Sequence, residues 1–146
     1  GAFSGRGKTS LVFLEGIQDS SKYCETLENF LLPCASRIGG ESWVLQQDNA
    51  PIHCSKVTKD WFAANNVRLL PWPARSPDLN PIENVWGQMV RKVYGNGRTF
   101  SSHAELKIAI QSAWNQVSQS SLENLLASMN KRCVEVVAMK GRTIDY

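Results

Sequence analysis

Closely spaced prolines restrict this chain more than any other feature of its sequence. Four of its six prolines, Pro71, Pro73, Pro77 and Pro81, lie within residues 71–81. Proline fixes φ and lacks an amide hydrogen, so this segment is predicted to be a rigid connector rather than a helix or an interior strand. Asn80 is a favoured N-cap and Pro81 a favoured first helical residue, so a helix is predicted to begin as soon as the connector ends.

The second half of the chain is predicted to be helical. Apolar side chains recur at helical spacing after the connector, at Ile82, Val85, Trp86, Met89, Val90 and Val93. Capping boxes, in which a serine precedes a glutamate by three residues, are predicted at 102–105 and 120–123 and start two further helices. A last helix is predicted over 129–139, stopping at Gly141.

The first half is predicted to mix strands with helices. Two glycines between β-prone runs predict a hairpin with arms 1–4 and 9–14, and a serine cap predicts a helix that fades at Pro33 and the Gly39–Gly40 pair. Further strands are predicted at 43–48 and 67–70, on either side of a helix that follows Pro51. The order β-β-α-β-α-β-α-α-α predicts an α/β domain with helices packed on a small mixed sheet.

Composition limits the class of protein. The chain has 146 residues, of which 42% are hydrophobic and 20% charged, so one folded domain is predicted. Its longest purely apolar run is residues 11–14, which excludes a membrane span and a signal-peptide core. The four cysteines show no zinc or redox spacing, so buried thiols in a reducing compartment are favoured over disulfides.

The net charge of +3 comes from the second half of the chain. Residues 74–146 hold nine basic and six acidic side chains, whereas residues 1–73 hold seven of each. This balance permits a nucleic-acid partner but is equally consistent with an ordinary solvated surface.

Two carboxylates occupy positions where a metal site is plausible. Asp48 is predicted at the carboxyl end of a strand, where ligands of open α/β sheets gather, and Glu83 one turn into the helix after the connector. A divalent cation would relieve the repulsion between two close carboxylates, and magnesium prefers such oxygen ligands. Structural roles are also open, because Asp48 could form an Asx turn and Glu83 could complete a capping box.

Two longer segments around these acids resemble a known family. Residues 46–53, QQDNAPIH, and residues 72–86, WPARSPDLNPIENVW, are similar to the signature blocks of the Tc/mariner superfamily of cut-and-paste DNA transposases. The spacing of 34 residues between Asp48 and Glu83, and Glu at the third place, resemble its Tc-like branch. The likeness extends to GAFS at 1–4, to Tyr23 and to SMNKR at 128–132, and so covers essentially the whole chain.

The resemblance implies a ribonuclease-H-like fold in which Asp48 and Glu83 are the second and third acids of an Asp-Asp-Glu triad that binds Mg²⁺, or Mn²⁺ as a substitute. It implies DNA as the partner, both transposon ends and target, with cleavage of the ends and their transfer into target DNA. A homodimer of the full-length protein and a nuclear location are expected on the same ground.

The chain departs from the family pattern at its beginning. None of the acids before Asp48 lies in the family's first-acid motif, and Asp19 is interpreted as a turn or cap residue. We therefore expect the carboxy-terminal part of a catalytic domain that lacks the first central strand, the first Asp and the amino-terminal DNA-binding modules, and that is inactive alone. The rival hypotheses are a non-catalytic relic or domesticated DNA- or protein-binding domain, and another ribonuclease-H-like nuclease.

Four further residues are candidates for DNA contact. His53 could approach a phosphate or metal-bound water, or could equally brace the next helix. Arg75 could contact phosphate beside the site, and Arg91 and Lys92 could follow the DNA backbone, although exposed cations usually face solvent.

Overall fold

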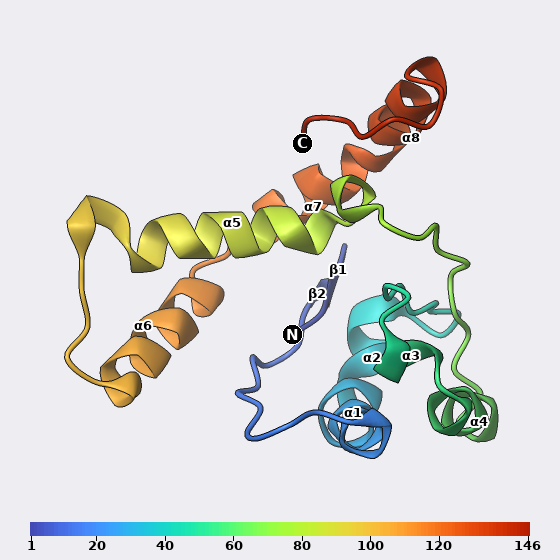
Figure 1. Cartoon of the computed structure of the whole chain (residues 1–146), viewed down its shortest axis with the longest axis horizontal. Coiled ribbons are helices and arrows are strands. Elements are labelled where there is room, and N and C mark those ends of the chain that lie inside the picture. Colours follow the sequence, from blue (N-terminus) through green and yellow to red (C-terminus); the bar gives the residue numbers. More distant parts are fainter. The chain divides into compact units, whose positions relative to one another are not determined.

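The computed structural model describes residues 1–146, and the chain divides into two compact units, Gly1–Arg75 and Ser76–Tyr146 (Figure 1). The boundary falls inside the proline-rich connector.

The first unit holds β1 (Phe3–Ser4), β2 (Gly7–Lys8), α1 (Ser20–Thr26), the π-helical turn η1 (Leu27–Leu31), α2 (Leu32–Gly39), α3 (Pro51–Cys54) and α4 (Lys56–Ala64). The second unit holds the 3₁₀ turn η2 (Pro77–Leu79), α5 (Pro81–Val93), the 3₁₀ turn η3 (Gly95–Gly97), α6 (His103–Asn115), α7 (Gln119–Ala127) and α8 (Met129–Ala138).

The predicted hairpin is present but shorter than expected. β1 and β2 pair antiparallel, with Phe3 opposite Lys8 and Ser4 opposite Gly7. The second arm is therefore Gly7–Lys8 and not residues 9–14, because a two-residue turn closes the hairpin earlier. Thr9 extends the pairing by one residue, since its amide donates to the Ala2 carbonyl oxygen at 2.8 Å.

The first helical segment continues past Pro33 and ends at the predicted Gly39–Gly40 pair. Pro33 lies in the first turn of α2, directly after the π-helical turn η1. In a regular α-helix proline would clash with the carbonyl four residues earlier, and the wider hydrogen-bond pattern of a π turn relieves this clash. The helix ends at Gly39, and Gly40 follows as its C-cap with a φ of 81°, which glycine adopts at little cost.

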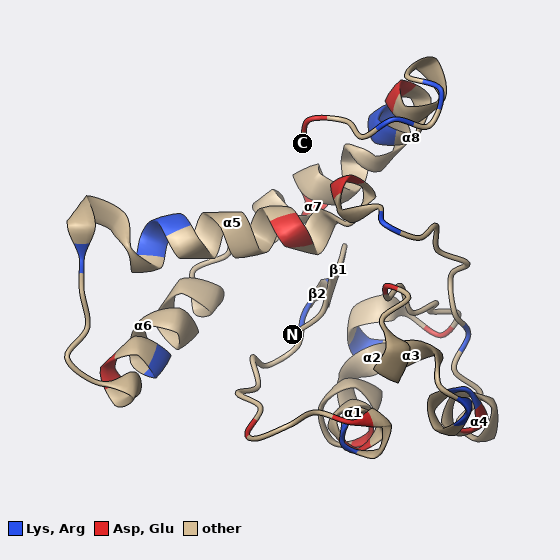
Figure 2. Ribbon diagram, viewed as in Figure 1, with Lys and Arg blue, Asp and Glu red and all other residues tan.

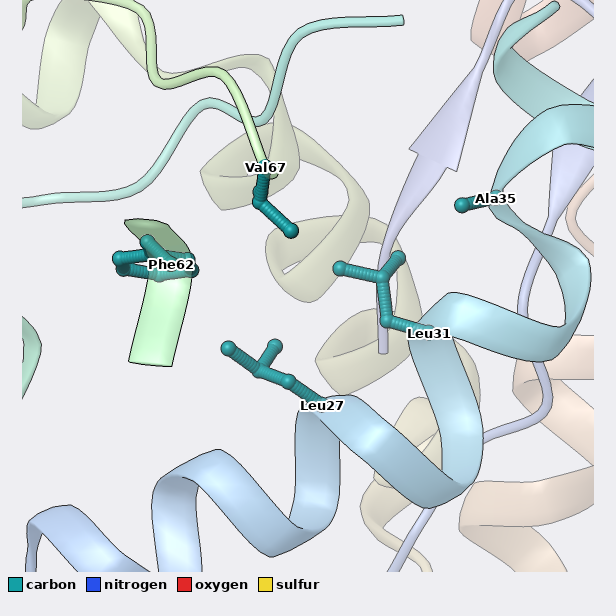
Figure 3. Packing of buried hydrophobic residues seen from close by; sticks show 5 residues of the cluster. All are labelled: Leu27, Leu31, Ala35, Phe62 and Val67. Atoms are coloured by element: carbon teal, nitrogen blue, oxygen red, sulfur yellow. The ribbon is translucent and has the colours of Figure 1, made fainter. Parts of the chain in front are cut away.

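The core of the first unit joins α1, η1 and α2 to α4. Its buried members are Leu27, Leu31, Ala35, Phe62 and Val67. Figure 3 shows the Leu27, Leu31, Phe62 and Val67 side chains directed toward one another. Burial of these apolar side chains provides most of the free energy that holds this unit together.

The two inner strands are much shorter than predicted. Residues 43–48 and 67–70 meet in a single parallel bridge between Leu45 and Leu69. The Leu45 amide donates to the Arg68 carbonyl oxygen at 2.8 Å, and the Leu70 amide donates to the Leu45 carbonyl oxygen at 2.9 Å. Parallel pairs are stable mainly inside larger buried sheets, and no third strand of this chain pairs with either segment.

The helix predicted after Pro51 is interrupted once. Ser55 separates α3 from α4 and caps α4, because its Oγ accepts a hydrogen bond from the Thr58 amide at 3.1 Å. The fully buried Thr58 hydroxyl then donates to the Ile52 carbonyl oxygen at 2.6 Å and joins the two short helices.

In the second unit α5 packs against α6 and α7. Val85, Met89 and Val93 are buried as the helical pattern predicts, but Val90 is 56% exposed. The Trp86 ring stacks on the ring of Trp114 from α6, with centroids 5.5 Å apart. The apolar face of α5 is therefore narrower than the sequence pattern suggests.

The helix starts of the second unit were predicted with one error. Asn80 caps α5 by accepting from the Ile82 amide at 3.4 Å, and Ser102 caps α6 by accepting from the Glu105 amide at 3.1 Å. The cap of α7 is Ser118 rather than Ser120, which makes α7 begin at Gln119.

The cysteines are all free, as expected, but only Cys24 is buried and Cys133 is exposed. The expectation of buried thiols therefore holds for Cys24 alone. No helix is long and apolar enough to cross a membrane.

Candidate metal and DNA site

Asp48 lies at the turn that leads from the bridged segment into α3. Its Oδ1 accepts a hydrogen bond from the Ala50 amide at 3.0 Å, which is the Asx turn predicted as the structural alternative. The same Oδ1 lies 2.6 Å from His53 Nδ1. The Asp48 side chain is 62% exposed, so its other oxygen remains available to a ligand.

These two contacts favour the ionised carboxylate. The Ala50 amide, followed by His53, lowers the pKa of Asp48 below its ordinary value, although partial burial opposes the shift. The contribution of these Asp48 contacts to folding stability is therefore present at pH values above the ordinary aspartate pKa. It is lost as the pH falls through the lower pKa that Asp48 has in the folded state. At neutral pH Asp48 is an anion, as metal binding requires.

His53 belongs to a small bracing network. Its ring lies against the Tyr23 ring, with centroids 4.3 Å apart. The Tyr23 hydroxyl donates to Gln47 Oε1 at 2.6 Å, and Gln47 Nε2 donates to the His53 carbonyl oxygen at 3.2 Å. Burial, with a smaller effect of Asp48, raises the pKa of Tyr23, so the phenol stays protonated and remains a donor.

Sequence reasoning did not assign Tyr23 and Gln47 to the site. Gln47 adjoins Asp48 in the sequence, and this was the available signal. Tyr23 precedes Gln47 by 24 positions in the sequence, so the two residues meet only because α1 packs against α3.

We expect His53→Ala to raise the pKa of Asp48 only part of the way to its ordinary value. The Ala50 amide is the larger cause of the low pKa, and it remains in the variant. A carboxyl-carbon NMR titration of Asp48 in both proteins measures the change. An Asp48 pKa that is identical in the two proteins would show that His53 does not stabilise the carboxylate.

Glu83 lies in the first turn of α5. Its side chain is exposed and has neither a hydrogen-bond nor an ion-pair partner. The capping-box alternative is not realised, because the Asn80 amide donates instead to the Pro77 carbonyl oxygen at 2.9 Å.

The donor chemistry of both acids fits a hard divalent cation. Asp48 and Glu83 each present a solvent-accessible carboxylate, which is the ligand type that magnesium and manganese take. Asp48 belongs to the first unit and Glu83 to the second. No group of three or more histidine, cysteine, aspartate or glutamate side chains gathers as a metal cluster.

The candidate DNA contacts are distributed over both units. His53 directly contacts Asp48, whereas Arg75 is an exposed residue with a φ of 56° at the end of the first unit. Arg91 and Lys92 are exposed in the last turn of α5. Figure 2 shows the acidic colour toward one end of α5 and the basic colour toward the other.

The DDE superfamily endonuclease family matches residues 1–107, which include both Asp48 and Glu83. The chain belongs to this family. It is 40% identical over 146 residues to the Tc3 transposase of Caenorhabditis elegans, covering all of this chain and 44% of the relative. It is also 40% identical over 147 residues to the Tcb2 transposase of Caenorhabditis briggsae, covering 53% of that protein. The chain thus spans about half the length of the curated relatives it matches.

Solved structures confirm the predicted fold. The catalytic domain of Mos1 mariner transposase matches with a TM-score of 0.71 and 18% identity, over 89% of this chain and 66% of that domain. The Mos1 paired-end complex with Mn matches with a TM-score of 0.77 and 20% identity, over 88% of this chain and 38% of that one. The chain therefore has the ribonuclease-H-like fold of a transposase catalytic domain.

Proposed function

We propose that these 146 residues are the carboxy-terminal part of the catalytic domain of a Tc-like DNA transposase. The proposed reaction is cleavage of transposon ends followed by their transfer into target DNA. The observation that carries the proposal is that Asp48 and Glu83, the acids of the two signature segments, both present exposed carboxylates suited to a divalent metal. Membership of the DDE endonuclease family and identity to the Tc3 and Tcb2 transposases support this assignment.

Asp48 and Glu83 would hold the metal, with Mg²⁺ as the proposed ion and Mn²⁺ as a substitute. Such an ion supplies charge neutralisation at the phosphate and an acidified water or hydroxyl nucleophile. The Ala50 amide and His53 both contact Oδ1 of Asp48, which leaves the second carboxylate oxygen free for the metal. Solved Mos1 catalytic-domain structures with Mn and with Mg support this choice of ion.

DNA is the proposed partner. Arg75, Arg91 and Lys92 are exposed cations that could contact phosphates without reading sequence. The fold match to Mos1 transposase in a paired-end complex with the left transposon end supports this role. A homodimer of the full-length protein and action in the nucleus complete the proposal. Nothing in the structure favours the alternative of a non-catalytic relic.

The test is metal-dependent cleavage by the complete transposase that carries these residues. A labelled duplex bearing the terminal repeat of its own element is incubated with the protein and Mg²⁺ or Mn²⁺. We expect strand cleavage that stops when EDTA is added and resumes when Mg²⁺ is restored. Cleavage that persists in EDTA would contradict the proposal.

A further inference from the structure

Arg132 is the only positively charged side chain in the buried set of this protein. It lies on α8 and is 1% exposed. All three guanidinium nitrogens donate hydrogen bonds: Nε to Ser128 Oγ at 2.9 Å, Nη1 to the Asp78 carbonyl oxygen at 2.8 Å and Nη2 to Asn84 Oδ1 at 2.8 Å. An arginine so fully bonded is held in one orientation by the fork geometry of its donors.

Two of the three acceptors belong to the segments that precede and follow the proposed catalytic glutamate in the sequence. Asp78 is in the 3₁₀ turn η2 that leads into α5, and Asn84 directly follows Glu83 in the first turn of α5. The Arg132 side chain therefore links the end of the connector to the first turn of α5, which carries Glu83. Arg132 follows Asp78 by 54 positions and Asn84 by 48 positions in the sequence.

The end of the chain closes the same cluster from another side. The Ile144 amide donates to Asp78 Oδ2 at 3.0 Å, and Ile144 is itself buried. The Tyr146 ring lies against the guanidinium, with Cζ 4.4 Å from the ring centroid. Asp78, in the turn before α5, is thus held through its carbonyl oxygen by Arg132 and through its carboxylate by the Ile144 amide.

We interpret the Arg132 network as a means of setting a position in the structure and not mainly as a source of folding stability. A buried guanidinium loses its hydration, and replacing a buried charged network with apolar residues is often neutral or favourable for stability. Burial lowers the pKa of Arg132, but guanidinium groups remain charged at neutral pH. The network instead defines the position of one short segment relative to α8.

We propose that Arg132 is a positioning residue for Glu83. By joining the Asp78 carbonyl to the Asn84 side chain, it sets the path of the connector and the start of α5, and so the direction of the Glu83 carboxylate. The inference rests on the proposed function, in which Glu83 holds a divalent metal. Its physical basis is that displacing a reacting group by about 1 Å can reduce a rate about 100-fold.

The first measurement is amide hydrogen exchange on the chain and on Arg132→Lys, which keeps the charge but not the fork. We expect exchange at the Asn80, Glu83 and Ile144 amides to become about ten-fold faster, because hydrogen bonds to the charged group that holds them are lost. Exchange at the Leu106 amide in α6 and at the Gln116 amide that caps its end should be unchanged. An equal rise at α6 would indicate general destabilisation and overturn the inference.

Arg142→Lys is the matched control, because Arg142 is exposed in the same carboxy-terminal segment and its side chain has no partner. Exchange in this variant should equal that of the parent. Asn84→Ala, which removes only the Nη2 acceptor, is the second variant. It should accelerate exchange at Glu83 more than at Ile144, whereas no change at Glu83 would contradict the proposed path of coupling.

The second measurement is the Mn²⁺ dependence of DNA cleavage by the complete transposase. Mutation of residues that orient metal ligands typically lowers metal affinity about 10- to 100-fold. Arg132→Lys should therefore raise the half-saturating Mn²⁺ concentration about ten-fold or more. A parent protein that cleaves, with an Arg132→Lys variant of unchanged Mn²⁺ dependence, overturns this inference alone. A parent protein that does not cleave with any metal overturns the proposed function and the inference together.

Discussion

Replacing Glu83 with glutamine is expected to abolish metal-dependent cleavage by the complete transposase. The amide has nearly the same shape but no charge, so the proposed metal loses one of its two ligands from this chain. Because metal ions contribute several kcal/mol to such reactions and each 1.36 kcal/mol is a factor of ten, the loss should be about 1000-fold or greater. The rate of cleavage of a labelled transposon-end duplex under single-turnover conditions measures it, and Asp48→Asn should behave similarly.

The change at Glu83 should leave the fold and DNA binding intact. Its side chain is exposed and makes no hydrogen bond, so the thermal unfolding temperature should match that of the parent. Glu123→Gln, which alters an exposed glutamate on α7, is the control and should cleave at the parental rate. A Glu83→Gln protein that still cuts DNA in a magnesium-dependent reaction would remove Glu83 from the site.

Replacing Trp114 with alanine should produce the largest loss of stability among the changes considered. Trp114 is 1% exposed and stacks on Trp86 of α5, so its removal leaves a large cavity between α5 and α6. Substitutions of this kind lower the free energy of unfolding by about 3–5 kcal/mol. Urea titration followed by tryptophan fluorescence and circular dichroism measures the shift of the transition.

Ile108→Ala on the same helix is the matched control for Trp114→Ala. Ile108 is 71% exposed, so its truncation should change the free energy of unfolding by no more than about 0.5 kcal/mol. Comparable losses in the two variants would show that α6 is not packed through Trp114. A loss confined to Trp114→Ala supports the stacked pair as the centre of the second unit.

The helix starts near the candidate site were largely predictable because their signals are local. Asn80 followed by Pro81 specifies an N-cap and a first helical residue within two positions, and the structure has both. At α6 the local signal is Ser102, whose hydroxyl oxygen accepts a hydrogen bond from the Glu105 amide. The errors arise where competing local signals exist, as at Ser118 and Ser120, or where a neighbouring turn absorbs a proline, as at Pro33.

The strands were less predictable because their hydrogen-bonding partners lie far away in the sequence. Residues 43–48 and 67–70 have β-prone sequences, yet they pair only between Leu45 and Leu69. Strand length depends on the neighbours available for hydrogen bonding and on burial of both faces. Neither property is present in the local sequence.

The sequence by itself determined the family, the connector, the two carboxylates and the helix that carries Glu83, because each depends on residues close together in the chain. Only the tertiary structure decided what supports those carboxylates. The stacking of Tyr23 on His53 and the bonding of Arg132 to Asp78 and Asn84 join segments far apart in sequence. Such contacts form only when helices pack, since buried polar groups then need partners that water no longer provides.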